Sequence, residues 1–310
     1  TAVLCGDAYV VVWPDDSGEV AIYPHKPANV CVFYDEAAPG RVTHAAKCWR
    51  QPDGRVRINI FFRDRVERYI SLGTSELAVP DVRSFVPTAD GIAENPFGVV
   101  PVFHFANNGD IGSYGISELE SAIPIQDGLN KAVLDMLVAM EFSAYRQRWA
   151  VGIEYDVDTD GKPMKPFNSG VEHLWITDNP NARFGDFAAA DLEQFLKVKD
   201  GFRMDMASVT GTPLYYLMPQ IKGIPSGESL KKAETRFIGK VRDRQASFGQ
   251  VWADVMSFAL KAKGVAADAE IAVRWEDATQ LSDRERLENI LLKRRIGLSA
   301  DEALAEAGYL

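Results

Sequence analysis

The sequence predicts an α+β protein in which a β-rich region comes first and helices follow. Three observations predict this order. Residues 1–105 contain short runs of Val, Ile, Phe and Tyr separated by turn signals. Residues 116–148 and 189–209 carry apolar side chains at helical spacing, and residues 227–263 continue that spacing over a longer stretch. Of the 310 residues 46% are hydrophobic, which is enough for a sizeable core.

Short apolar segments of the first region are expected to form an antiparallel sheet or a small sandwich. Residues 95–108 are expected to be extended, because each proline disfavours helix at the residue before it. The run that opens at Thr1 is also strand-like, which suggests a fragment whose natural N-terminus is missing. The clearest predicted strands are residues 7–13, 19–24, 29–35, 41–51, 56–64 and 66–72.

Helices and a small β interlude are predicted for the rest of the chain. Pro124 should start or kink the first helix, and the interlude follows within residues 149–177. The helix at 227–263 would be about 55 Å long if straight, with Gly239 and Gly249 as candidate bend points.

The C-terminal part is predicted to contain one strand at residues 270–277 and then two helices. The helices are expected at residues 282–295 and 299–307. Each range opens with a serine N-cap, Ser282 or Ser299, with a glutamate three residues later, which is the capping-box pattern.

Charge and cysteine content exclude several classes of protein. The 44 acidic and 34 basic residues give a net charge of −10, which disfavours tight binding of DNA through its phosphates. The three cysteines form no C-x-x-C pair, so a disulfide framework or a zinc site is not expected and an intracellular origin is favoured. No apolar run approaches the ~20 residues of a transmembrane helix, so no membrane partner is expected. The cysteines are Cys5, Cys31 and Cys48.

Residues 156–161, DVDTDG, match the opening of a calcium-binding EF-hand loop. The twelfth position of such a loop needs a glutamate, and here it is Phe167. We therefore predict a hairpin with Asp160 and Gly161 at the tip of a type I′ turn. A calcium-dependent β-domain that uses Asp156, Asp158 and Asp160 remains an alternative.

The stretch Gly223–Ser229, GIPSGES, has a faint similarity to a phosphate-binding loop. Its spacing differs from the P-loop pattern, and Glu228 stands where the phosphate-binding lysine is required. We instead predict a helix N-terminus, with Ser226 as the N-cap and Glu228 favourable to the helix dipole. A nucleotide-binding enzyme that uses this loop is the alternative function.

Other side chains give no catalytic arrangement. The four histidines are scattered, no serine lies in G-x-S-x-G, and the carboxylates form no recognisable pair, so we predict no catalytic residue, cofactor or metal. The basic residues of the long helix are expected to form a solvated face. Four tryptophans are expected to be core or subunit-contact anchors: Trp149, Trp175, Trp252 and Trp275. The basic residues are Lys231, Lys232, Arg236, Lys240, Arg242 and Arg244.

The order of these elements resembles the portal (head–tail connector) proteins of tailed bacteriophages. Two stretches carry the resemblance. One is residues 95–152, which include NPFGVVPVFHFAN and GISELESAIPIQDGLNKAVLDML; the other is residues 209–256, which include VTGTPLYYLMPQIKGIPSGESLKKAE. The similarity extends over roughly residues 6–310, without a short signature motif.

The resemblance implies a portal-type α+β fold with a β-rich wing, two stem helices that enclose a small α/β clip, and a long helix after a tunnel loop. The family's N-terminal arm and part of its crown would be missing from this chain. The implied parts are the wing (1–115), first stem helix (116–148), clip (149–187), second stem helix (188–210), tunnel loop (211–226), long helix with a wing strand (227–280) and start of the crown (281–310).

The resemblance also implies a function without bond chemistry. The chain would be one subunit of a homo-oligomeric ring, expected to be a dodecamer, through which double-stranded DNA is packaged, retained and ejected. The ring would lie at the portal vertex of the virion capsid and be assembled in the host cytoplasm. Expected partners are the terminase large subunit, the major capsid or scaffold protein and head–tail connector proteins. The residues expected to face DNA are Met218, Gln220, Ile221 and Lys222.

Overall fold

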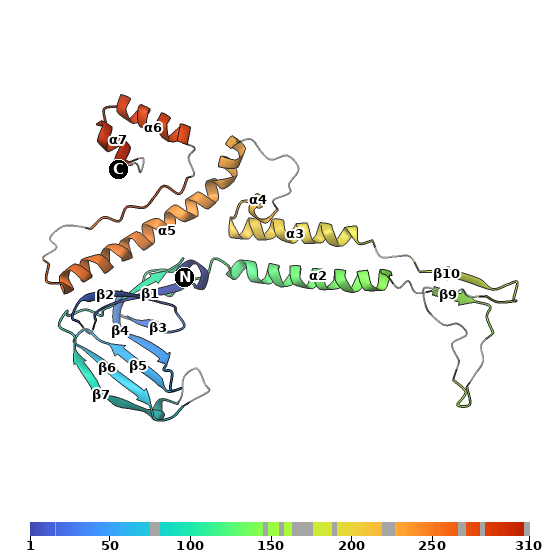
Figure 1. Ribbon diagram of the computed structural model, residues 1–310, viewed down its shortest axis with the longest axis horizontal. Helices are drawn as coiled ribbons and strands as arrows, with labels where there is room; N and C mark the ends of the chain where they lie inside the picture. Colours follow the sequence, from blue (N-terminus) through green and yellow to red (C-terminus); the bar gives the residue numbers. More distant parts are fainter. Residues whose placement is uncertain are drawn as a thin grey trace. The chain divides into compact units, whose positions relative to one another are not determined.

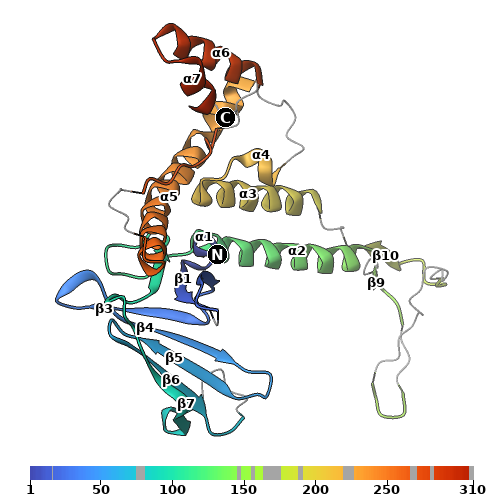
Figure 2. The ribbon, with the colours of Figure 1, turned by 60° about the vertical axis from the view of Figure 1, so that its left-hand side comes forward.

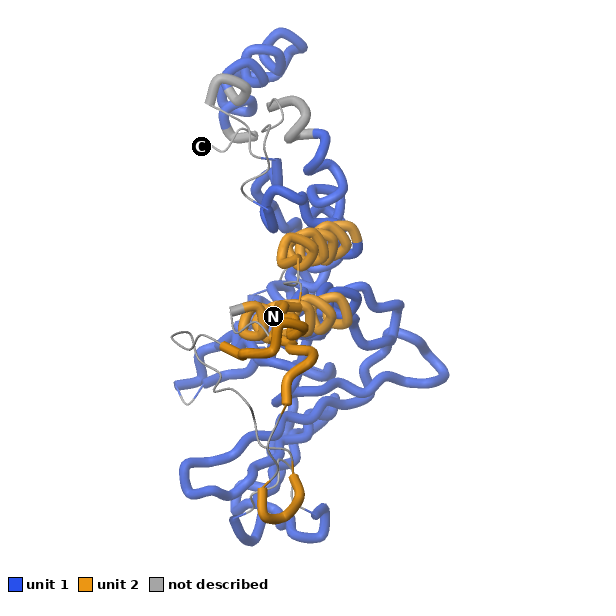
Figure 3. The backbone as a smooth tube through the Cα atoms, turned by 90° about the vertical axis from the view of Figure 1, so that its right-hand side faces the viewer, with its two compact units in different colours: residues 1–122, 209–310 blue, residues 123–208 orange. Residues whose placement is uncertain are grey.

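The computed structural model divides the chain into two compact units, which Figure 3 distinguishes by colour. The first unit contains Thr1–Ala122 and Val209–Leu310, and the second contains Ile123–Ser208. The chain therefore leaves the first unit once and returns to it once. The structure describes residues 1–15, 17–74, 81–144, 148–154, 158–162, 176–187, 191–218, 227–265, 271–279 and 283–306.

In the described part of the first unit, eight strands form two antiparallel sheets. In the three-stranded sheet β1 (Asp7–Pro14) lies between β2 (Val20–His25) and β8 (Val102–Ala106). The other sheet has the order β3-β4-β5-β6-β7, so consecutive strands are neighbours, and Figure 2 shows them side by side. Its strands are β3 (Val30–Asp35), β4 (Ala38–Arg50), β5 (Val56–Phe61), β6 (Arg65–Ser71) and β7 (Phe85–Glu94).

Strand β1 is buried on both faces, which explains its continuous apolar run. Tyr9 and Val11 belong to a core cluster with strands of the larger sheet, including Val32 and Phe61. Because side chains alternate along a strand, Val12 points the other way, into a second cluster. The small sheet therefore lies between the larger sheet and the long helix.

Helix α5 (Gly227–Ala262) covers the second face of the small sheet. Its 36 residues span about 54 Å at 1.5 Å per residue. Val255 and Phe258 are buried in the contact, and the ring of Trp252 lies 5.1 Å from that of Phe105 in β8. This packing fixes the position of α5 on the β-rich part of the unit.

The described part of the second unit contains two helices and a two-stranded sheet. Helix α2 (Ile123–Ala144) and helix α3 (Glu193–Thr210), whose last two residues belong to the first unit, run side by side in Figures 1 and 2. They approach closely at Gly128, where an added Cβ would lie 2.8 Å from the Phe202 ring. Strand β9 (Arg148–Val151) pairs antiparallel with β10 (Arg183–Asp186).

Several predicted elements are confirmed. All six strands predicted within residues 7–72 are present with small shifts of their ends. Pro124 is the second residue of α2, where its missing N–H costs no helical hydrogen bond. The capping box of α7 (Ala300–Glu306) also forms, since the Glu302 N–H donates to Ser299 Oγ at 3.2 Å and the Ser299 N–H to Glu302 Oε2 at 2.9 Å. Helix α6 (Asp283–Arg295) lies where it was predicted, and Ser282 lies outside the described residues.

Three predictions at element ends are wrong. The strand-like opening at Thr1 forms helix α1 (Ala2–Cys5), which places the Gly6 carbonyl to accept from the Asn107 N–H at 2.8 Å. The first long helix begins at Ile123 rather than near residue 116. The residues before it form a loop and then the short 3₁₀ helix η2 (Glu120–Ala122). The second begins at Glu193 rather than residue 189.

The strand predicted at residues 270–277 is also wrong in its described part. Residues 271–279 pair with no strand in the structure as described. They contact α5 instead: the Gln245 side chain donates to the Glu276 carbonyl at 3.0 Å, and Trp275 lies against Gly249. The alternation of apolar residues reflected packing on a helix. The short 3₁₀ helix η1 (Val82–Ser84) and strand β7 were not predicted.

No helix among the described residues combines the length and the apolar character needed to cross a membrane.

Candidate functional site

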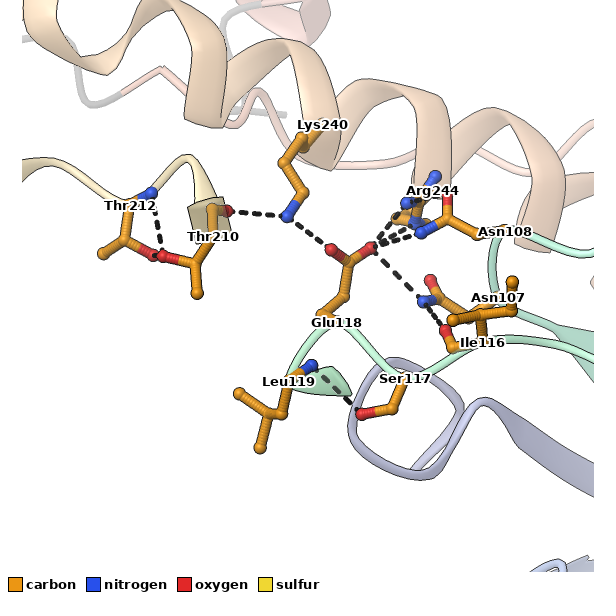
Figure 4. Close-up of polar contacts among 10 residues, drawn as sticks. All are labelled: Asn107, Asn108, Ile116, Ser117, Glu118, Leu119, Thr210, Thr212, Lys240 and Arg244. Atoms are coloured by element: carbon orange, nitrogen blue, oxygen red, sulfur yellow. Dashed lines mark hydrogen bonds and ion pairs between the residues drawn. The ribbon is translucent and has the colours of Figure 1, made fainter. Parts of the chain in front are cut away.

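A polar junction lies at the two places where the chain crosses between the units, and Figure 4 shows it. Glu118 comes shortly before the exit at Ala122, and Thr210 comes directly after the return at Val209. Both contact helix α5 of the same unit. We call this group of residues the crossing junction; it contains Asn107, Asn108, Glu118, Thr210, Lys240 and Arg244.

The loop that leads to Glu118 is closed by Asn107, which is fully buried. Its carbonyl accepts from the Ile116 N–H at 2.6 Å, and its side-chain amide donates to the Ile116 carbonyl at 2.7 Å. Asn108 has a φ of 54°, a left-handed conformation that asparagine adopts more readily than most residues. These bonds hold Glu118 in one place beside α5.

The Glu118 carboxylate receives donors from two segments of the chain, the loop after β8 and helix α5 (Figure 4). The side-chain amides of Asn107 and Asn108 each donate to Oε1 at 3.2 Å. Arg244 Nε donates to the same oxygen at 3.1 Å, while Lys240 Nζ pairs with Oε2. Lys240 and Arg244 are four residues apart on α5, so they lie on one face of the helix.

The charged groups shift the protonation of Glu118. Burial alone would raise the pKa of its carboxyl, but hydrogen bonds from Lys240, Arg244 and Asn107 outweigh burial and lower that pKa to about 2. Glu118 is therefore ionised at neutral pH. The side chains of Lys240 and Arg244 are only 30% and 19% exposed. The expectation that the basic residues of α5 form a solvated face is wrong for these two, because they bind the partly buried Glu118 carboxylate.

Lys240 also binds the end of helix α3. Its ammonium group donates to the Thr210 carbonyl, the last of the helix, at 2.8 Å. A cation at this place is favourable to the helix dipole. The next residue, Gly211, has a φ of 66°, and an added Cβ would lie 3.2 Å from Arg236 Nε. One lysine thus connects the exit segment, the return segment and α5.

Beside the junction lies an open cavity of about 450 Å³. Most of its wall is apolar and comes from α5, including Phe237, Val241 and Phe248. Leu119 and Trp275 complete the wall, and they are 45% and 42% exposed. The expectation that tryptophans are anchors is met in the core by Trp252, whereas Trp149 and Trp275 are partly exposed and Trp175 lies outside the described residues.

The residues predicted to face DNA are only partly described. Met218 directly follows the short helix α4 (Leu214–Leu217) and is half-buried. Gln220, Ile221 and Lys222 lie outside the described residues. The stretch predicted as a loop from Pro213 therefore begins with one helical turn, which the sequence analysis missed.

Helix α5 begins at Gly227, as expected if Gly223–Ser229 contains a helix N-terminus. The proposed N-cap Ser226 lies outside the described residues. Glu228 is the second residue of the helix.

The acidic turn at residues 158–162 has its own backbone donors. Asp158 Oδ1 accepts from the N–H groups of Asp160 and Lys162, each at 2.9 Å. Gly161 has a φ of 75°, whereas Asp160 is not among the described residues with positive φ. The predicted turn at Asp160–Gly161 is confirmed, but its type is wrong: a type I′ turn needs positive φ at both residues. No group of three potential metal ligands occurs among the described residues; Asp156 lies outside them.

Comparisons with known proteins place the chain in a family. The family model described as "Phage portal protein, SPP1 Gp6-like" matches residues 1–305. The chain belongs to this phage portal protein family, which is a structural rather than an enzymatic family. It is similar to the portal proteins of Mycobacterium phage L5 and Mycobacterium phage D29, in each case 28% identical over 170 residues. The match covers 53% of this chain and 35% of each relative, so the chain spans about a third of the length of these curated relatives.

Proposed function

We propose that the chain is a portal subunit whose ring forms a channel for double-stranded DNA during packaging, retention and ejection. The single observation that supports this most strongly is the family match over residues 1–305. The mixed α and β structure is compatible with it.

The division into units supports an assignment of parts. The second unit, Ile123–Ser208, lies within the range proposed for the two stem helices and the clip, residues 116–210. The β sheets with α5 would then be the wing, and α6 with α7 the start of the crown. Residues 211–226 would be the tunnel loop, with Met218, Gln220, Ile221 and Lys222 toward the DNA. The Met218 side chain would be oriented by the turn of α4 that precedes it.

Exposed apolar side chains on α2 support assembly into a ring. Leu134, Leu137 and Phe142 are 61%, 54% and 62% exposed in the single chain. Such side chains are unfavourable in water and favour contact with another protein surface. A contact between two different faces of identical subunits closes into a ring when the rotation fits. We propose that neighbouring subunits cover this face in a cyclic oligomer, with a dodecamer as the expected number.

Charge supports passage of DNA rather than tight binding. The net charge of −10 provides no overall excess of cations for the phosphates. The chain would act by enclosing and guiding DNA, and ATP hydrolysis would belong to a separate terminase large subunit docked at the clip, residues 149–187. Head–tail connector proteins and the major capsid or scaffold protein would contact the ring at the capsid vertex.

Negative-stain electron microscopy and light scattering test this proposal. We expect ring-shaped particles with a central hole and a mass of many subunits. Phe142→Asp should prevent assembly because it places a charge in the proposed contact, while the neighbouring exposed change Glu141→Gln should not. A chain that stays monomeric at high concentration, or a Phe142→Asp ring identical to the wild type, would contradict the proposed contact.

A further inference from the structure

A row of polar side chains crosses the inner face of the five-stranded sheet. Lys47, Asn59 and Arg68 are direct register partners on β4, β5 and β6. Two residues along each strand lies the row Ala45, Phe61 and Val66, which is buried in the core between the sheets. Because side chains two residues apart share a face, the polar row faces the small sheet as well.

A cavity of about 120 Å³ lies against this row. Strand β2 provides its other wall through Tyr23 and His25, and the apolar residues beneath it include Trp13. One water molecule occupies about 30 Å³ of liquid, so the cavity has room for an ion of several atoms. All of its lining residues belong to the first unit.

Two buried polar atoms at this cavity have no hydrogen-bond partner within the described part of the chain. They are His25 Nε2 and Asn59 Oδ1. Buried polar atoms are nearly always hydrogen-bonded, and one explanation of an exception is a water molecule or ion that binds there. The imidazole can donate a hydrogen bond and the amide oxygen can accept one. A ligand that satisfies both atoms must therefore carry an acceptor and a donor.

Two cationic side chains, Lys47 and Arg68, also line the cavity. Lys47 has no ion pair among the described residues, and its ammonium group lies 4.9 Å from the centre of the Trp49 ring. Arg68 pairs with Asp90, whose side chain is 60% exposed. Burial lowers the pKa of Lys47, and burial together with the charge of Lys47 lowers the pKa of His25. A bound anion would stabilise the charged forms of both groups.

We propose that this cavity binds a small oxyanion of the phosphate class. Lys47 and Arg68 would contribute charge, His25 would donate to one phosphate oxygen, and the P–OH of hydrogen phosphate would donate to Asn59 Oδ1. Sulfate has the same shape but no proton to donate near neutral pH, so it should bind more weakly. The cavity is small, so a free ion is the expected ligand rather than the backbone of duplex DNA.

Isothermal titration calorimetry of the full chain with inorganic phosphate tests the site, at constant ionic strength with chloride as the background anion. We expect saturable binding that is weakened about tenfold or more by Lys47→Gln, because a charged hydrogen bond is lost. Lys26→Gln removes the same charge from an exposed residue outside the cavity and should leave the affinity unchanged. Asn59→Asp keeps the side-chain size and should abolish binding, which provides a second variant if Lys47→Gln does not fold.

Three results of the titrations would overturn the proposal of a phosphate site. These are no saturable binding of phosphate to the wild type, an equal loss in Lys47→Gln and Lys26→Gln, or sulfate affinity equal to that of phosphate. The same holds if a duplex oligonucleotide binds in a Lys47-dependent way while free phosphate does not. Circular dichroism of each variant separates lost binding from lost folding.

Discussion

Replacing Glu118 with glutamine tests whether the crossing junction stabilises the first unit. Glu118→Gln keeps the size of the side chain and most hydrogen-bond positions but removes the negative charge. Lys240 and Arg244 would then face a neutral amide. Each retains one other acceptor, the Thr210 carbonyl for Lys240 and the Asn108 side chain for Arg244. The loss of folding free energy should therefore be large, but smaller than if Lys240 and Arg244 were left without any hydrogen-bond acceptor.

The shifted pKa of Glu118 provides the magnitude. The pKa falls from 4.5 to about 2, and each unit of pKa shift corresponds to about 1.4 kcal/mol of interaction free energy. The ionised carboxylate therefore contributes about 3 kcal/mol. Its side chain is 15% exposed, so water screens part of this interaction. We expect Glu118→Gln to lower the free energy of unfolding by about 2–3 kcal/mol at pH 7, and the melting temperature by about 5–10 °C for a unit of this size.

The pH dependence gives the sharper measurement. A carboxyl whose pKa is lower in the folded state contributes stability above its unfolded pKa and loses it as the pH falls through the folded pKa. The difference in the free energy of unfolding between wild type and Glu118→Gln should have its full value above about pH 5. It should disappear as the pH falls from about 4.5 to 2. Thermal unfolding at fixed protein concentration across this range measures it.

Glu141→Gln is the matched control, because Glu141 is an exposed carboxyl on α2. It should change the melting temperature little at any pH. The reasoning is refuted if Glu118→Gln costs less than about 0.5 kcal/mol at pH 7, or if its effect is the same at pH 7 and pH 2.5. The second result would mean that side-chain packing, and not charge, stabilises the junction.

Three further changes test the backbone, the core and a buried hydrogen bond by chemical denaturation. Gly211→Ala should cost about 1–2 kcal/mol because its φ is 66°, while Gly201→Ala, in helix α3 with open space around it, should be stabilising by about 0.5–1 kcal/mol; equal effects would contradict this. Phe105→Ala should cost about 3–5 kcal/mol because Phe105 is 5% exposed between β8 and α5, and a cost under about 1 kcal/mol would mean that the site collapses freely. Tyr34→Phe should cost about 1–3 kcal/mol because its hydroxyl lies 2.6 Å from the buried His104 Nδ1; a neutral result would show that water replaces it.

Local patterns predicted most of the secondary structure. The β-branched and aromatic runs were sufficient for six strands, and the helical spacing for α2, α3 and α5. Strand β7 was missed because its segment contains Pro87 and Gly91, which weaken any strand signal. The strand predicted at 270–277 was wrong although its sequence has a clear alternating pattern. An alternating pattern predicts one apolar face, but whether a strand or a helix covers that face depends on tertiary structure.

The crossing junction could not be predicted in the same way. Glu118 lies 122 residues before Lys240, and neither belongs to a recognised motif. The only available signal was the density of basic residues on α5, and local sequence suggests solvent for them. Burial of Glu118 depends on Asn107 and Asn108, which close the loop in front of it. The partners of a charge are determined by the fold, so the sequence alone favoured the wrong environment.

The position of Lys240 connects this chemistry to the proposed function. In a portal ring the stem and clip would experience force from the motor and the moving DNA, whereas the wing would stay in the capsid wall. The chain passes between the two units at residues 122–123 and 208–209. Both crossings are held to α5 by one ammonium group, through the Glu118 carboxylate and the Thr210 carbonyl. We expect these charged contacts to resist separation of the exit and return segments from α5, so that α5 would receive load from both proposed stem helices together.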